Sequence, residues 1–376
     1  MGKIRILQVL SDSNIGGAGR LLYNLSKSIN SEKFEFIYVF PKGSELCELF
    51  NEEKKYILSH GSDRSSDIRA ALEIRRIIKS SQPHIIHTHS SLFARIGAKL
   101  AGFDKKRVIY TKHCVFDTPK ITESKIFRHA YRIIDNFLSD NIIAVADAAK
   151  DELIAYGVNE DKITVIINGV NPLLETTEEE KQTLREKLGI KKNNFTVGIS
   201  ARLEEYKGHK TLIKAAEITK KQGIDDIAFL ILGDGSYAEE FKNYAESLGV
   251  SDRIFFLGFK KNVAEYVNLF DVNVNCSIGT ETSSLAISEG LSLGKPIIAT
   301  DFGGNPNMVK EGETGFIIPQ NDARSLTDKI IFLKDNPDIL KYMSKNAKLD
   351  FGERFSAKIM ADKYENYYIS ILRKKG

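Results

Sequence analysis

The sequence predicts an α/β protein built from two doubly wound domains with parallel sheets. Short β-rich runs alternate with amphipathic stretches, as in "IRILQVL" (4–10) before "GRLLYNLSKSI" (19–29) and "NIIAVA" (141–146) before "AAKDELIAYG" (148–157). Such alternation is typical of βαβ units, whose sheets are covered on both faces. A length of 376 residues, with 42% hydrophobic content, also exceeds what one domain commonly needs.

The alternation lapses over residues 168–194, where a turn precedes a highly charged helical stretch. We therefore expect domains of residues 1–170 and 171–352. Residues 353–376 carry apolar and aromatic side chains at helical spacing, and we expect a terminal helix that packs across the domains. Because open α/β sheets bind ligands beyond the carboxyl ends of their strands, functional residues should lie on loops that follow strands, beside a cleft.

Composition excludes several classes of protein. A formal net charge of +4, with acids and bases interspersed, gives no footprint of a nucleic-acid partner. Cys47, Cys114 and Cys276 lie far apart, which suggests neither a disulfide framework nor a thiolate zinc site. The first residues lack a signal-peptide pattern, and no apolar run is long enough to span a bilayer. We expect a cytoplasmic protein, with peripheral attachment to the inner face of the membrane as the alternative.

The stretch "ETSSLAISE" holds Glu281 and Glu289 around the start of a helix that Ser283, Ser284 and Leu285 open. It follows a β-rich run, and a helix N-terminus after a strand favours phosphate through its unpaired N–H groups and its dipole. Two carboxylates about 12 Å apart by helical rise would flank a bound diphosphate and hold hydroxyl groups at either end. Two solvated glutamates are the simpler alternative, since this spacing is common by chance.

The stretch "LGDGSYAEE" matches a dinucleotide fingerprint, because Gly233, Gly235 and Ala238 satisfy G-x-G-x-x-A between a β-rich run and a helix. A nicotinamide-dependent dehydrogenase is therefore an alternative. The next β-rich run, however, ends in Lys260 and Lys261, where that fold needs an acid for the ribose hydroxyl.

Two glycines and a group of histidines stand out in the first half. Gly16 and Gly17 follow the first strand, where missing side chains would let a phosphate or an acceptor approach the backbone; an ordinary turn is the alternative. His87 and His89 would share a strand face, which raises the possibility of zinc, but no third ligand at a suitable spacing follows. His113 follows a strand of the same domain, and a structural histidine is the alternative there.

Several stretches resemble the family-4 retaining glycosyltransferases of GT-B fold. In the second half these are "SARLEEYKGHKTLIKA", "LILGDGSYAEEF" and "ETSSLAISEGLSLGKPIIATDFGGNP"; in the first half they are "GGAGRLLYNL", "IIHTHS" and "IINGVN". The resemblance covers nearly the whole chain. It implies two Rossmann-like domains, the first on the acceptor side and the second binding the nucleotide sugar.

The resemblance also implies roles for individual residues. Glu281 would contact hydroxyls of the donor sugar and Glu289 the ribose. Arg202 and Lys207 would neutralise the diphosphate, and fixed cations can stabilise a departing nucleoside diphosphate without a metal. His113 would face the reacting sugar, mainly to position it. We count His113, Glu281, Arg202 and Lys207 as catalytic candidates; the donor-binding candidates are Gly16, Gly17, Gly233, Gly235, Ser283, Ser284, Leu285 and Glu289.

The activity implied is transfer of a hexose-type sugar, with retention, to a hydroxyl of a carbohydrate or lipid-linked acceptor in surface polysaccharide or glycoconjugate synthesis. The donor would be a UDP-sugar, with GDP-sugars as the second choice, and neither a cofactor nor a divalent metal is expected. A nucleotide-sugar epimerase or hydrolase of the same fold, or a non-catalytic nucleotide-binding homologue, is the alternative.

Residues 121–137 predict a helix with a basic face. Lys125, Arg128, His129 and Arg132 recur at helical spacing, and many relatives act on lipid-linked acceptors at membranes. This face is a candidate for docking on an anionic membrane, with a merely solvated face as the alternative.

The chain departs from the family pattern at two places. Thr282, Ser283 and Ser284 stand where the family has a small residue, an aromatic or leucine, and glycine or proline. Asn307 stands where the family often has glutamate. These departures bear on the identity of the donor sugar.

Overall fold

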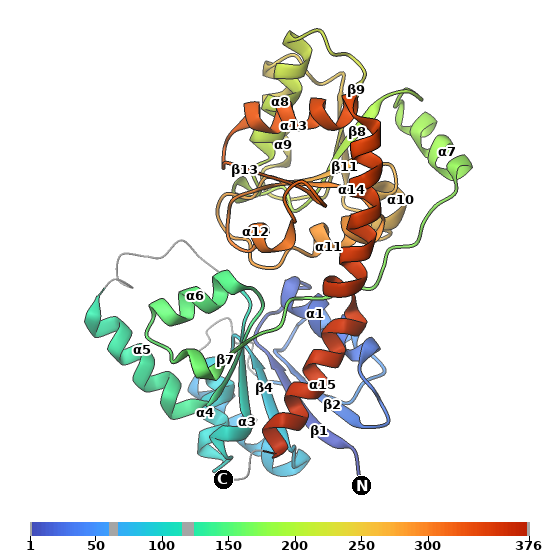
Figure 1. Cartoon of the computed structure of the whole chain (residues 1–376). Coiled ribbons are helices and arrows are strands. Elements are labelled where there is room, and N and C mark those ends of the chain that lie inside the picture. The colour runs from blue at the N-terminus through green and yellow to red at the C-terminus, as the bar shows by residue number, and fades with distance from the viewer. Residues whose placement is uncertain (1, 60–66, 115–123, 374–376) are drawn as a thin grey trace. The chain divides into compact units, whose positions relative to one another are not determined.

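The chain forms two compact units in the computed structural model, which describes residues 2–59, 67–114 and 124–373. The first unit comprises Met1–Val170 together with Ala357–Gly376, and the second comprises Asn171–Ser356 (Figure 1). Each unit holds one parallel sheet between layers of helices, which is a Rossmann-like architecture.

The first unit contains a parallel sheet of seven strands in the order β3-β2-β1-β4-β5-β6-β7. The strands are β1 Ile4–Leu10, β2 Phe34–Phe40, β3 Lys55–Ile57, β4 Ile85–His89, β5 Val108–Lys112, β6 Asn141–Ala144 and β7 Ile163–Val165. The helices are α1 Gly17–Ser28, α2 Leu46–Leu49, α3 Ile68–Ser81, α4 Leu92–Leu100, η1 Lys105–Arg107, α5 Lys125–Leu138, α6 Asp147–Ala155, η3 Glu160–Lys162 and α15 Ala357–Arg373.

The second unit contains a parallel sheet of six strands in the order β10-β9-β8-β11-β12-β13. The strands are β8 Phe195–Ser200, β9 Ile227–Leu232, β10 Ile254–Gly258, β11 Val272–Asn275, β12 Ile297–Thr300 and β13 Gly315–Ile318. The helices are α7 Glu178–Leu188, η4 Glu205–Lys207, α8 His209–Lys221, α9 Ala238–Ser247, α10 Val263–Val267, α11 Leu285–Ser292, α12 Asn305–Met308, α13 Ala323–Asp335, α14 Pro337–Asp350 and η5 Phe351–Phe355.

Both sheets reverse their winding direction at one point. In the first unit β1 pairs with β2 on one side and with β4 on the other, and in the second unit β8 pairs with β9 and with β11. A crevice opens beyond the carboxyl ends of the strands at such a reversal, which is where doubly wound sheets bind ligands. The loops after β1, β4, β8 and β11 are therefore the places to look for a site.

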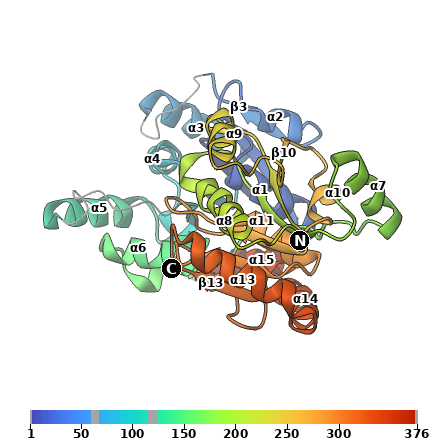
Figure 2. The same ribbon diagram turned by 90° about the horizontal axis from the view of Figure 1, so that it is seen from above.

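The cores lie between the sheets and their helices. In the first unit, buried side chains of α1 and α15 cover one face of the sheet and those of α3 and α4 cover the other. In the second unit, α8, α9 and α13 cover one face, while α7 and α10 contribute to the other. Helices α5 and α6 lie side by side (Figure 1, Figure 2), and Tyr131 and Tyr156 join them with ring centroids 5.2 Å apart.

The terminal helix differs from the expectation in its start and in its packing. It begins at Ala357 and not near residue 353, because η5 continues α14 as a π-helical turn up to Phe355. Its buried side chains, among them Met360, Tyr364 and Tyr368, join the core of the first unit. Tertiary packing chose this partner, since helical periodicity identifies an apolar face and not what covers it.

No helix in residues 2–59, 67–114 and 124–373 is long and apolar enough to cross a membrane.

Candidate functional site

The loop after β8 and the loop after β11 come together at the reversal point of the second sheet. Gly208, which ends η4 and precedes α8, has a φ of 69°, and a Cβ added to it would lie 1.9 Å from the Cys276 carbonyl oxygen. The backbone N–H of Ile278 also donates to the Tyr206 carbonyl oxygen over 2.8 Å. The two loops are therefore in direct backbone contact, and only glycine fits at position 208.

An ion pair joins these two loops. The Lys207 Nζ lies 2.8 Å from the Glu281 Oε2, and the two side chains are only 17% and 11% exposed. The same carboxylate oxygen accepts hydrogen bonds from the Ser277 Oγ over 3.0 Å and the Asn275 Nδ2 over 3.2 Å. Glu281 is thus held by three donors. Charge-assisted hydrogen bonds of this kind fix geometry more firmly than neutral ones.

Asn275, at the end of β11, connects Glu281 to the start of α11. Its Nδ2 also donates to the Ser284 Oγ over 3.0 Å, and Ser284 is the N-cap of α11, whose Oγ accepts from the Ile287 N–H over 3.4 Å. The Ser284 N–H donates to the Met308 Sδ over 3.1 Å. These contacts fix the N-terminus of α11 beside the ion pair. The predicted strand, loop and helix N-terminus are all present here.

The remaining candidates near α11 are placed by this helix and its N-cap. Ser283 precedes the N-cap Ser284, Leu285 is the first residue of the helix, and Glu289 is half-buried on the second turn. The backbone at Glu281 is fixed from the other side by Gly303, whose φ is 57° and whose added Cβ would lie 1.9 Å from the Glu281 carbonyl oxygen. Glu281 is therefore positioned through both its backbone and its side chain.

The glycine loop after β9 has a structural role that accounts for its motif. Gly233 has a φ of 142°, and an added Cβ would lie 2.0 Å from the Ala201 carbonyl oxygen; at Gly235 it would lie 2.4 Å from that of Leu203. The Leu203 N–H also donates to the Asp234 carbonyl oxygen over 3.0 Å. Both glycines therefore permit this loop to pack against the loop that carries Arg202.

Arg202 is exposed, and its Nη2 donates to the Tyr206 hydroxyl over 2.5 Å. The Tyr206 ring also lies under the Lys207 Nζ, 5.5 Å from its centroid. Beside these residues is an open pocket of about 340 Å³, lined by Glu204, Glu205, Tyr206, Tyr237, Ile278 and Gly279. The cationic side chains of Arg202 and Lys207 thus both lie near the Tyr206 ring, beside this pocket.

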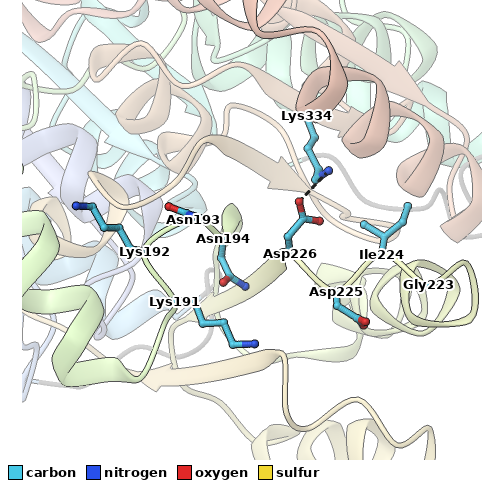
Figure 3. A pocket seen from close by; sticks show the side chains of 9 residues that line it. All are labelled: Lys191, Lys192, Asn193, Asn194, Gly223, Ile224, Asp225, Asp226 and Lys334. Carbon is cyan, nitrogen blue, oxygen red and sulfur yellow. Dashed lines mark ion pairs between the residues drawn. The ribbon is translucent and has the colours of Figure 1, made fainter.

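A second, larger pocket lies away from the candidate residues. It has a volume of about 610 Å³, and Figure 3 shows the residues that line it, with the ion pair of 3.0 Å between Lys334 and Asp226. Asn194 precedes β8 and Asp226 precedes β9, so this pocket lies at the amino ends of the strands. The candidate residues follow the carboxyl ends, where ligands of such folds bind.

In the first unit, the half-buried His113 stands at the end of a chain of hydrogen-bonded polar side chains. Its Nε2 lies 2.9 Å from the His89 Nδ1, and the His89 Nε2 lies 2.9 Å from the Gln8 Oε1. His87 and His89 share a face as predicted, with ring centroids 4.3 Å apart. Burial lowers the pKa of His87 to about 3 and that of His113 to about 4, and places the pKa of His89 well below its usual value, so all three rings are neutral at neutral pH.

The rings of His87 and His89 already use both nitrogens within the protein. His87 contacts the Tyr368 hydroxyl over 2.8 Å and the Thr111 hydroxyl over 2.6 Å, and His89 is held between Gln8 and His113. Among the described residues, no group of three or more His, Cys, Asp or Glu side chains is arranged to hold a metal ion.

Gly16 and Gly17 lie at the start of α1 with space beside them. A Cβ added to either glycine would meet no atom within 4 Å, and Gly16 has a φ of −93°, which any residue can adopt. Neither turn geometry nor packing in the described residues therefore requires glycine at position 16.

Comparison with known proteins identifies the family. Residues 15–172 match the model described as Glycosyltransferase Family 4, and residues 180–350 match that of Glycosyl transferases group 1. The chain belongs to the group 1, family 4 glycosyltransferases. This assignment replaces the dehydrogenase interpretation of the Gly233 loop, which lies inside the second matched region.

Three similar proteins cover nearly the whole chain. The UDP-Gal:alpha-D-GlcNAc-diphosphoundecaprenol alpha-1,3-galactosyltransferase of Escherichia coli is 27% identical over 99% of this chain and 98% of its own length. A glycosyltransferase crystal structure from Rickettsia africae ESF-5 superposes with a TM-score of 0.86 at 24% identity, over 100% of both chains. Anabaena Alr3699/HepE in complex with UDP superposes with a TM-score of 0.83 at 20% identity, over 97% of this chain and 100% of the other. These structures show that the fold is GT-B.

Sequence reasoning missed four residues of the described network. Asn275 and Ser277 hold Glu281, while Gln8 and Tyr368 belong to the chain of hydrogen bonds that ends at His113. Polar residues inside otherwise apolar strands were the available signal for Gln8 in "IRILQVL" and Asn275 in "DVNVNCS", because buried polar groups need partners.

Proposed function

We propose that this glycosyltransferase moves a hexose-type sugar from a UDP-sugar to a hydroxyl of a carbohydrate or lipid-linked acceptor, with retention of configuration. The observation that carries the proposal is the Lys207–Glu281 ion pair beside the capped N-terminus of α11, at the reversal point of the second sheet. It places a cation, a carboxylate and the N–H groups of a helix end within one small region. A nucleoside diphosphate and its sugar offer the complementary groups.

Each side chain has a role in this proposal. Lys207 and Arg202 neutralise the diphosphate as the nucleoside diphosphate leaves, so that no divalent metal is needed. Glu281, fixed by Asn275 and Ser277, accepts hydrogen bonds from the donor sugar. Glu289, farther along α11, accepts hydrogen bonds from the ribose.

The other candidates belong to the loops that surround these groups. Ser283, Ser284 and Leu285 present the start of α11 to the diphosphate, while Gly233 and Gly235 shape the loop beside Arg202. Gly16 and Gly17 leave the start of α1 open, and His113 positions the transferred sugar.

UDP is the favoured nucleotide because the Escherichia coli relative is named for UDP-Gal and the Anabaena structure holds UDP. A lipid-linked acceptor is supported by the diphosphoundecaprenol in the first of these names. GDP-sugars remain the second choice of donor. For retention we propose a front-face route, in which the leaving phosphate accepts the proton of the acceptor hydroxyl.

Thermal unfolding with UDP, GDP, ADP or NAD in excess tests the donor site. A ligand at about 100 times its dissociation constant adds roughly 2.7 kcal/mol to the free energy of unfolding. We expect UDP to stabilise the wild type and to lose this effect in Glu289→Ala and Lys207→Met. Lys210→Met is the matched control, because Lys210 follows Lys207 by three residues, on α8, and forms a half-exposed ion pair with Glu240 of α9.

Transfer is then measured with UDP-sugars and a lipid-linked or oligosaccharide acceptor, and the anomeric configuration of the product reports retention. Product that forms without any acceptor would favour the epimerase or hydrolase alternative. UDP binding without turnover on any acceptor would favour a non-catalytic homologue, and stabilisation by NAD alone would contradict the donor site itself.

We also propose that α5 docks on an anionic membrane surface. Lys125, His129 and Arg132 are exposed along one side of this helix, and Ile126, Ile133, Ile134 and Phe137 are exposed along the adjacent side, with Ile126 82% exposed. The third side holds the helix to the unit through the buried Arg95–Asp135 ion pair of 2.8 Å. Residues 121–123 of the predicted docking segment lie outside the described residues.

An apolar stripe beside a basic stripe is the pattern of helices that lie in a membrane interface. We expect the protein to bind vesicles that contain anionic lipid at low salt, and to lose binding in Lys125→Gln/Arg132→Gln. Lys191→Gln/Lys192→Gln, which removes two exposed lysines of the second unit, is the control. Equal binding of neutral and anionic vesicles would contradict the electrostatic part of the proposal.

A further inference from the structure

We infer that Gln8 and Tyr368 are positioning residues that hold His113 in one tautomer, with a proton on Nε2 and a bare Nδ1 that accepts a hydrogen bond from a sugar hydroxyl. Its use in transfer rests on the function proposed above, whereas the tautomer itself is a property of the free protein.

The argument starts from a continuous chain of hydrogen bonds through the core of the first unit. The Gln8 Nε2 donates to the Tyr368 hydroxyl over 3.2 Å, and the Gln8 Oε1 lies 2.9 Å from the His89 Nε2. The His89 Nδ1 then lies 2.9 Å from the His113 Nε2. Gln8, His89 and Tyr368 are at most 2% exposed, so water does not supply alternative partners.

Each link in this chain fixes the next one. An amide oxygen only accepts, so the proton between Gln8 and His89 belongs to the His89 Nε2. A neutral imidazole carries one N–H, which leaves the His89 Nδ1 as an acceptor. The proton between the two rings therefore belongs to the His113 Nε2, and the His113 Nδ1 carries none.

Tyr368 sets the direction of the whole chain because it has a single hydroxyl proton. Its oxygen lies 2.8 Å from the His87 Nδ1, and the His87 Nε2 lies 2.6 Å from the Thr111 Oγ1. When His87 donates to Thr111, its Nδ1 accepts the Tyr368 proton, and the Tyr368 oxygen can then only accept from the Gln8 amide. This arrangement is the one that turns the Gln8 oxygen toward His89.

The opposite direction would leave a buried donor without a partner. With all protons reversed, the His113 Nδ1 would carry a hydrogen, and this buried atom has no hydrogen-bond partner among the residues that the structure describes. Orphaned N–H groups are rarer in proteins than under-used acceptors, because an acceptor with no partner costs less. The His113 Nδ1 of the free protein therefore carries a buried lone pair, for which we propose a sugar hydroxyl as the donor.

Nitrogen NMR of histidine-labelled protein at neutral pH tests the tautomer directly, with His113 assigned from His113→Asn. We expect a protonated Nε2 and a bare Nδ1 in the wild type, and a mixture of tautomers in Gln8→Leu and Tyr368→Phe. Tyr367→Phe is the matched control, because Tyr367 is half-buried beside Tyr368 on α15 and its hydroxyl interacts with Thr164, which is outside the hydrogen-bonded chain. A protonated Nδ1 in the wild type, or an unchanged tautomer in Tyr368→Phe, would overturn the inference.

Kinetics separate this inference from the function on which it rests. We expect Tyr368→Phe to lower kcat about tenfold, because the free energy of one hydrogen bond corresponds to about that ratio of rates. The KM for the donor should change little. Tyr367→Phe should retain wild-type kcat. The expected NMR result together with an unchanged kcat in His113→Asn would uphold the tautomer and refute its use in transfer. If the wild type lacks the expected His113 tautomer while His113→Asn still lowers kcat, the inference about Gln8 and Tyr368 is refuted and the proposed function remains intact.

Discussion

Replacement of Gly208 by alanine should lower the free energy of unfolding of the second unit far more than the same change at Gly189. Both glycines have left-handed backbone, with φ of 69° and 74°, so both substitutions meet the same backbone strain of about 1 kcal/mol. The surroundings differ. A Cβ at position 208 would lie 1.9 Å from the Cys276 carbonyl oxygen, whereas a Cβ at position 189 would meet no atom within 4 Å.

The clash at position 208 requires the loop after β8 and the loop after β11 to separate. Real Cβ atoms essentially never approach closer than 3.0 Å, so the two backbones must move by more than an ångström. Overpacking of this kind costs about 1–3 kcal/mol, which gives a total of about 2–4 kcal/mol for Gly208→Ala. We expect about 1 kcal/mol for Gly189→Ala.

Urea unfolding of the two variants measures this difference. The chain has no tryptophan, so far-ultraviolet circular dichroism is the suitable signal. Both positions lie in the second unit, so the same unfolding transition reports both changes. The shift should be accompanied by weaker UDP binding in Gly208→Ala alone, since Lys207 and Glu281 sit on the displaced loops. Equal costs at the two positions would refute the close approach of these loops.

Three further predictions concern stability. Burial lowers the pKa of His87 to about 3 and of His113 to about 4 from an ordinary value of 6.5, so the unfolded chain binds more protons than the folded one between pH 6.5 and 4. Stability should therefore fall as the pH falls through this window, by up to about 1.4 kcal/mol per pH unit for each ring, and urea midpoints that do not move between pH 7 and 5 would contradict this. Arg95→Leu should cost about 3–5 kcal/mol because it leaves Asp135 buried without its partner, and thermal unfolding should show recovery in Arg95→Leu/Asp135→Leu. Ser284→Ala should cost about 0.5–2 kcal/mol by removing the N-cap of α11, as measured by the same thermal unfolding assay.

Much of the local structure could be predicted from the residues alone. The period of the apolar side chains indicated strands that alternate with helices, and the serines before Leu285 indicated the start of the helix at α11. His87 and His89 could be placed on one face because side chains alternate along a strand. The family resemblance added the assignment of the chain to the glycosyltransferases, which the two family models confirm.

The partners of the polar side chains could not be predicted in this way. Lys207 and Glu281 are 74 residues apart, and Gln8 and Tyr368 are 360 residues apart, yet each pair is in direct contact. Local periodicity says which face of an element is buried, but the crossovers between strands decide which loops meet. The sequence therefore singled out Gly233 without showing what approaches it.

What the sequence by itself determined was the set of elements and the chemistry available to them, because propensity and periodicity act over a few residues. What only the tertiary structure decided was how that chemistry is combined. It paired Glu281 with Lys207, Asn275 and Ser277, assigned α15 to the core of the first unit, and aligned Gln8 between Tyr368 and His89. The reason is that buried hydrogen-bonding groups must find partners, and the winding of the sheets selects which distant residues are within reach.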